Sequence, residues 1–124
     1  MILASADIDA DVFNRDIAKR ISAYYPRTTV YASDKDKALW GSDALSSNPR
    51  VGEIRGGFPT VKSRSGLDIV DASSVETDFI SHSYFGDAGS VISDIHNIIE
   101  SHSPPPRQFL KQADGPSGAF WRFK

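Results

Sequence analysis

Two side chains in the sequence are typical of proton-transfer chemistry, the carboxylate of Asp36 and the imidazole of His82. A carboxylate that accepts a hydrogen bond from imidazole Nδ1 fixes the tautomer of the ring. It also stabilises the imidazolium that forms when the histidine takes up a proton. The two residues therefore predict an acid and a general base, which still need a nucleophile.

Other roles stay open for both residues. Asp34 and Asp7 each follow a predicted strand and are alternative acids. Asp36 could instead only shape a strand-to-helix turn, which aspartate favours. His82 could be a solvated loop histidine.

The elements that must position this pair follow a β-α-β-α-β-α order. Apolar and β-branched runs predict strands at 1–6, 27–33 and 67–71. A helix is expected between an aspartate cap at Asp9 or Asp11 and Pro26. A short second helix starts at Lys37, and isoleucines at helical spacing predict the last helix over 91–99.

This order predicts an α/β fold with a three-stranded parallel sheet and covering helices. In such sheets functional residues collect just past the carboxyl ends of the strands. Asp36 and His82 follow the second and third strands, so we expect them at one edge of the sheet.

Two stretches fall outside this pattern. Residues 49–66 are rich in glycine and proline and predict a long irregular loop with a short strand or turn at 51–54, of the kind that is usually functional or mobile. Prolines 104–106 end the last helix. We therefore expect one unit over 1–103 and a Pro-rich turn and tail over 104–124. The tail contains Phe120, Trp121 and Phe123 and should pack back onto the body.

Composition excludes several classes of function. The net charge of −2 provides no attraction for nucleic acid or an anionic membrane. The absence of cysteine excludes disulfides, thiolate catalysis and cysteine-ligated metals. No ligand spacing supports a zinc site from the three histidines, and Asp7, Asp9 and Asp11 lack the glycine and distal glutamate of a calcium loop. We therefore expect a protein without a metal or cofactor. We also expect it to be cytoplasmic, because no run approaches the ~20 apolar residues of a membrane span and no signal peptide is evident.

Three segments in order resemble a bacterial α/β-hydrolase family of esterase/lipase-like proteins that has no firm substrate. Residues 4–13 (ASADIDADVF) resemble the region of its sixth strand. Residues 30–39 (VYASDKDKAL) are similar to its acid-bearing segment. Residues 69–73 (IVDAS) with 81–85 (SHSYF) are similar to its eighth strand and catalytic-histidine loop. The resemblance implies that Asp36 is the triad acid and His82 the general base of a serine hydrolase acting on a small-molecule ester.

The chain also departs from that family. The family carries its nucleophile in a Gly-x-Ser-x-Gly elbow, which these 124 residues lack, and it tends to have proline where Ala6 stands. The chain therefore resembles the C-terminal part of a hydrolase, with acid and base but without the serine, and we expect it to be inactive alone.

The alternative is a non-catalytic α/β remnant or interaction module that pairs through strand 1–6. In the hydrolase fold that strand would expose an unpaired apolar edge, which invites a second copy or an upstream half of the protein.

Overall fold

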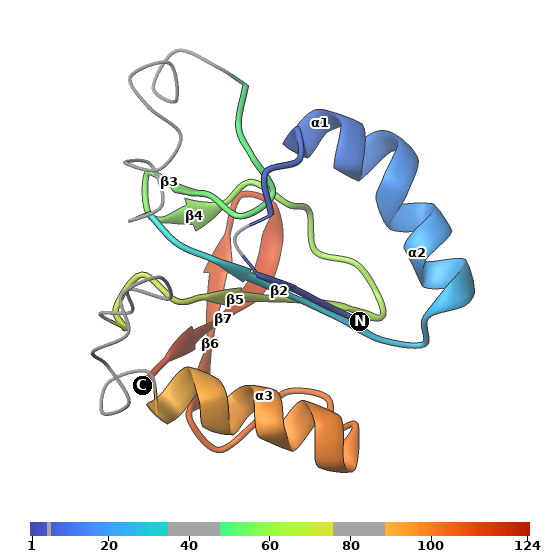
Figure 1. The fold of residues 1–124 in the computed structure, drawn as a ribbon. Coiled ribbons are helices and arrows are strands. Elements are labelled where there is room, and N and C mark those ends of the chain that lie inside the picture. The colour runs from blue at the N-terminus through green and yellow to red at the C-terminus, as the bar shows by residue number, and fades with distance from the viewer. Residues whose placement is uncertain (5, 35–47, 76–88) are drawn as a thin grey trace.

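The computed structural model describes residues 1–4, 6–34, 48–75 and 89–124 (Figure 1). Within these ranges the main sheet has five strands in the order β1-β2-β5-β7-β6. All neighbouring pairs are parallel except β6 with β7. The strands are β1 (Ile2–Ala4), β2 (Thr28–Ala32), β5 (Leu67–Asp71), β6 (Leu110–Gly115) and β7 (Gly118–Phe123).

The predicted α/β fold is confirmed, but the prediction of only three strands was wrong. The two additional strands form a hairpin from the C-terminal tail, and β7 pairs with β5. The sequence pattern concealed β6 because it is an edge strand with several exposed polar residues, Lys111, Gln112 and Asp114 among them. Such a strand lacks the apolar run on which the prediction relied.

The first predicted helix is confirmed as one continuous helical segment with a wider turn in its middle. It comprises α1 (Ala10–Val12), the π-helical turn η1 (Phe13–Ile17) and α2 (Ala18–Tyr24). Asp9 caps it, since its Oδ1 accepts a hydrogen bond of 3.0 Å from the backbone N–H of Val12. Phe13 is fully buried beneath the sheet, which contributes about 1.5–3 kcal/mol to stability.

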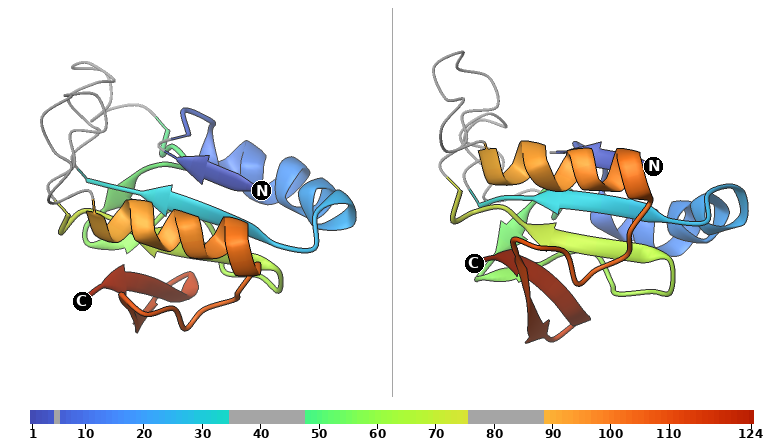
Figure 2. Two further views of the ribbon diagram at one scale, coloured as in Figure 1. Left: turned by 60° about the horizontal axis from the view of Figure 1, so that its bottom comes forward. Right: turned by 90° about the horizontal axis from the view of Figure 1, so that it is seen from below.

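The sheet separates two apolar cores because successive strand residues point to opposite faces. Val30 of β2 belongs to the core under the first helix, together with Phe13 and Phe120. Tyr31, the next residue, belongs to the core under α3 (Gly89–Ser101). Figure 2 shows α3 on the opposite side of the sheet from α1 and α2.

The glycine- and proline-rich stretch contains a small hairpin, β3 (Ile54–Arg55) with β4 (Phe58–Pro59). Its two-residue turn consists of Gly56 and Gly57, with φ of +61° and +84°. Positive φ at both central positions is the type I′ geometry that favours glycine. Within the described residues, no helix is long and apolar enough to cross a membrane.

The residues before this hairpin join two strand ends. The carbonyl of Ala6, beyond β1, accepts a hydrogen bond of 2.9 Å from the N–H of Gly52. The carbonyl of Gly52 in turn accepts one of 3.0 Å from the N–H of Ser33, beyond β2. This segment therefore lies between the chain that leaves β1 and the chain that leaves β2.

Candidate functional site

The carboxyl ends of β2 and β5 lie side by side. Ala32 and Asp71, the last residues of the two strands, are direct partners in the parallel register. The chain continues from β2 towards Asp36 and from β5 towards His82. Both of these residues lie outside the described ranges, in 35–47 and 76–88, so their pairing stays a prediction.

Four described residues connect these strand ends through polar contacts, and we call them the strand-end chain: Asp34, Asp71, Ser73 and Arg122. Arg122 Nε lies 3.4 Å from Asp71 Oδ2. Asp71 Oδ1 accepts a hydrogen bond of 2.9 Å from the backbone N–H of Ser73. Ser73 Oγ accepts one of 2.9 Å from the N–H of Asp34. The contacts therefore run from the C-terminal hairpin across β5 to the end of β2.

The two alternative acids occupy different places on this edge. Asp34 is exposed and directly follows β2, where its backbone meets Ser73. Asp7 lies beyond β1, and its exposed carboxylate is 3.3 Å from Arg50 Nε. Asp9 caps the helix, and the backbone N–H of Val12 is the main reason that the pKa of its carboxyl is lowered. Asp34 is thus the alternative acid that lies at the junction of β2 and β5.

A buried carboxylate that the sequence analysis missed lies next to this edge. Glu53 is only 1% exposed. Its Oε1 accepts a hydrogen bond of 2.8 Å from Arg55 Nε, and its Oε2 accepts one of 3.1 Å from the backbone N–H of Arg50. A charge is buried at tolerable cost only when it is paired in this way. No signal in the sequence separated Glu53 from an ordinary loop glutamate.

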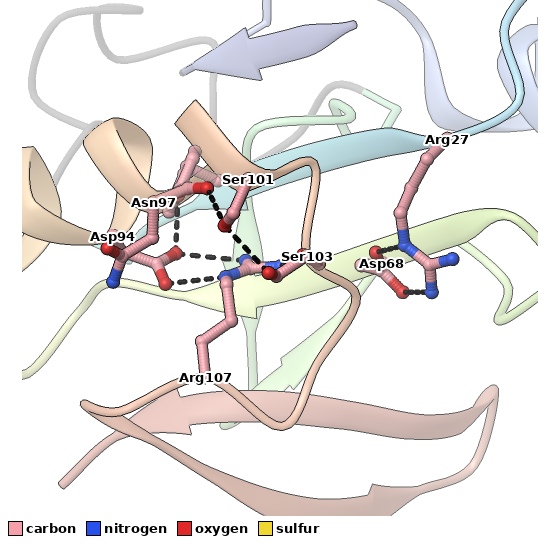
Figure 3. A network of polar contacts seen from close by, with 8 residues as sticks. Arg27, Asp68, Asp94, Asn97, Ser101, Ser103 and Arg107 are labelled. Atoms are coloured by element: carbon pink, nitrogen blue, oxygen red, sulfur yellow. Dashed lines mark hydrogen bonds and ion pairs between the residues drawn. The ribbon is translucent and has the colours of Figure 1, made fainter. Parts of the chain in front are cut away.

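The most buried ion pair of the described residues lies under α3, and we call it with its tyrosine the buried cluster: Tyr31, Asp94 and Arg107. Figure 3 shows Arg107 pointing from the segment before β6 towards Asp94 on α3. Its Nε and Nη2 donate to the two carboxylate oxygens at 2.6 and 2.9 Å. Tyr31 Oη donates to Asp94 Oδ2 at 2.5 Å.

The surroundings of the buried cluster shift the pKa values of two of its groups. Burial, followed by the hydrogen bond to Asp94, raises the pKa of Tyr31 far above its ordinary value. Burial would lower the pKa of Arg107, but the hydrogen bonds and charge of Asp94 raise it overall. Helical spacing offered one overlooked signal, because Asp94 lies three residues after the core residue Val91 and so shares its face.

A second pair on the same face lies nearer the amino ends of the strands. Arg27 Nε is 2.7 Å from Asp68 Oδ2 (Figure 3). In the part of the chain that the structure describes, no group of three His, Asp or Glu side chains could hold a metal ion. His96 and His102 are exposed, and His96 Nε2 lies 4.0 Å from Glu100 Oε1.

A comparison with protein families decides the relationship that the fold suggests. Residues 1–101 match the family described as alpha/beta hydrolase of unknown function (DUF900). The chain belongs to this α/β-hydrolase family. No curated protein and no solved structure matches it.

Family membership confirms the resemblance at the level of the α/β-hydrolase fold. The match to this α/β-hydrolase family ends at the last residue of α3, so the hairpin β6–β7 lies beyond it. The roles of Asp36 and His82, the status of the chain as a C-terminal part and the boundary at residue 103 stay predictions.

Proposed function

We propose that this α/β-hydrolase chain supplies the acid and the base of a serine hydrolase that cleaves small-molecule esters. The observation that carries the proposal is that β2 and β5 are parallel neighbours ending in register, with Asp34 and Ser73 hydrogen-bonded beyond them. Asp36 and His82 follow these two ends in the sequence.

The length of chain available supports a meeting of the two side chains. Asp36 comes two residues after Asp34, and His82 comes seven residues after Val75. At about 3.3–3.6 Å per extended residue, these stretches reach at most about 7 and about 25 Å. Hydrogen-bond contact between the carboxylate and the imidazole therefore lies within reach.

The proposed reaction needs no cofactor. Asp36 accepts the hydrogen bond from Nδ1 of His82, whose Nε2 takes the proton of a serine hydroxyl as the serine oxygen attacks the ester carbonyl carbon. The alcohol then leaves with that proton, and water releases the acid from the acyl-enzyme by the same roles. The 124 residues contain no Gly-x-Ser-x-Gly motif, so the serine of this scheme comes from another segment or another chain.

The test is the titration of His82, followed by NMR of the imidazole Cε1–H and assigned with His82→Gln. A neighbouring carboxylate stabilises the imidazolium, so Asp36→Asn should lower the pKa of His82 by about 1–3 units. Asp34→Asn and Asp7→Asn are matched controls that remove other carboxylates from the same edge.

The outcomes either identify the acid or exclude the acid–histidine pair. A fall in the pKa of His82 only in Asp36→Asn supports the proposal. A fall only in Asp34→Asn or Asp7→Asn moves the acid to that residue and overturns the role of Asp36. An unchanged pKa in all three variants would overturn the pair itself. Labelling of the chain by a serine-directed phosphonate would show that it carries its own nucleophile and contradict that part of the scheme.

A second candidate function, an interaction module, is favoured by the position of β1. This strand lies at one edge of the sheet as described, and its residues Ile2, Leu3 and Ala4 are all apolar. The opposite edge strand, β6, presents Lys111, Gln112 and Asp114. Charged residues on an edge discourage pairing with another chain, so β1 is the edge better suited to accept a strand.

Sedimentation measurements over a range of concentrations test this candidate. In the purified chain a second copy would supply the added strand. Ala4→Lys should then weaken association, because Ala4 is exposed and a lysine there places charge on the edge. Ala119→Lys on β7, also exposed, is the control and should associate like the natural chain. Monomers at all concentrations would contradict self-association.

A further inference from the structure

We propose that Ser73 and Asp71 are positioning residues, which hold the ends of β2 and β5 in the arrangement that the Asp36–His82 pair requires. The inference rests on the proposed function and extends it to residues that neither the sequence analysis nor the family match assigns. Its basis is the strand-end chain, whose contacts lie where the regular pairing of the two strands stops.

The backbone ladder between β2 and β5 ends just beyond the pair Ala32–Asp71. Its last hydrogen bond runs from the N–H of Ala72 to the carbonyl of Ala32 at 2.8 Å. The next connection is made by a side chain, because Ser73 Oγ accepts the N–H of Asp34 at 2.9 Å. The serine hydroxyl therefore continues the link between the strands after the backbones have ceased to pair.

Asp71 orients the serine that makes this link. Its Oδ1 accepts the N–H of Ser73, two residues further along, at 2.9 Å. This is the local turn that aspartate side chains favour, and it sets the direction in which the chain leaves β5. One carboxylate thus controls the start of the segment that leads to His82, and the serine beside it controls the start of the segment that leads to Asp36.

Arg122 balances the charge of Asp71, whose side chain is only 9% exposed. Its Nε lies 3.4 Å from Asp71 Oδ2, and its Nη2 donates to the carbonyl of Gly57 at 2.7 Å. Its guanidinium also lies 4.9 Å from the ring centre of Phe120. The hairpin β6–β7, which lies outside the family match, therefore contacts the strand-end chain through the side chain of Arg122.

The experiment repeats the His82 titration with Ser73→Ala. Loss of the hydroxyl should lower the pKa of His82, by less than Asp36→Asn does but in the same direction. Ser73→Thr keeps the hydroxyl and should restore the value. Ser101→Ala is the matched control, because Ser101 Oγ also makes a hydrogen bond of 2.7 Å, to the carbonyl of Asn97, but at the far end of α3.

The outcomes separate this inference from the proposed function. If Asp36→Asn shifts the pKa of His82 and Ser73→Ala does not, the positioning role is wrong while the pair stands. If Asp36→Asn causes no shift, the pair is wrong. If Ser101→Ala shifts the pKa as much as Ser73→Ala, a general loss of stability explains both results and overturns the positioning role.

Hydrogen exchange tests the contact itself. The amide of Asp34 should exchange faster in Ser73→Ala than in the natural chain, because its acceptor is gone. Equal exchange rates would show that this hydrogen bond does not hold the end of β2 in solution, and the inference would fall.

Discussion

The buried cluster under α3 and the strand-end chain both connect segments that are far apart in the sequence, but they do so in different surroundings. Arg107 and Asp94 are 2% and 0% exposed in their side chains, with two short hydrogen bonds between them. Arg122 is 39% exposed, and its contact with Asp71 measures 3.4 Å. The stronger contacts lie in the core under α3, and the weaker ones lie where the two candidate segments leave the sheet.

This difference in burial predicts different roles for the two sets of contacts: the buried cluster stabilises the fold, and the strand-end chain positions the candidate site. A buried ion pair strongly penalises the loss of one partner, since the other charge is then left unpaired out of water. A half-exposed pair contributes little to folding, because water and salt screen it. We therefore expect substitutions in the buried cluster to change the free energy of unfolding, and substitutions in the strand-end chain to change mainly the behaviour of His82.

The largest expected effect is that of Arg107→Leu, which leaves the carboxylate of Asp94 buried without its partner. It should lower the free energy of unfolding by about 3–5 kcal/mol, as measured by urea denaturation. Arg15→Leu removes an arginine from an exposed pair with Asp16 and is the matched control, with little change expected. Equal effects of the two variants would contradict the contrast between buried and exposed pairs.

Tyr31→Phe should cost less, about 1.5–3 kcal/mol, because it removes one hydrogen bond to a charged group and keeps the ion pair. Its pH dependence has a definite sign. The folded state raises the pKa of Tyr31, so this stabilisation is complete below the ordinary tyrosine value of about 10 and declines above it. The gap in unfolding free energy between the natural chain and Tyr31→Phe should therefore shrink at alkaline pH. A gap that widens there would refute the assignment.

Asp71→Asn should lower the free energy of unfolding by about 1 kcal/mol or less, since asparagine Oδ1 can still accept the N–H of Ser73. This loss should largely vanish in 1 M NaCl, where the Debye length is about 3 Å. The loss in Arg107→Leu should persist, because a buried pair is screened far less. Denaturation of both variants at low and high salt makes the comparison. A salt-resistant loss in Asp71→Asn would place it with the buried cluster.

The smallest expected effect is the pH dependence of the helix cap at Asp9, on the carboxyl side of β1. Its carboxyl pKa is lowered chiefly by the N–H of Val12, so the charge-dependent part of the cap is present above the ordinary value of about 4 and lost at lower pH. Asp9→Ala should therefore reduce stability at pH 7 and by a smaller margin in acid. Thermal unfolding at both pH values would show it, and a margin that grows in acid would contradict this sign.

Much of the fold could be predicted from residue patterns. Apolar and β-branched runs correctly indicated β1, β2 and β5, and helical spacing correctly indicated the first helix and α3. Of the two suggested caps, Asp9 proved to be the one used. The C-terminal hairpin could not be recognised as part of the sheet, because β6 is largely polar and gains its place only by pairing with β7. The pairing of β7 with β5 joins segments far apart in the sequence, so no local pattern encodes it.

The candidate site, like the fold, could be predicted only in part from the sequence. The sequence by itself determined the residue types that could do the chemistry, Asp36 and His82, and their order after two strands, because these are properties of the chain. Only the tertiary structure decided that β2 and β5 are neighbours ending in register, and that Asp71, Ser73 and Arg122 connect their ends. The physical reason is that these polar side chains acquire partners only once strands distant in the sequence are packed side by side.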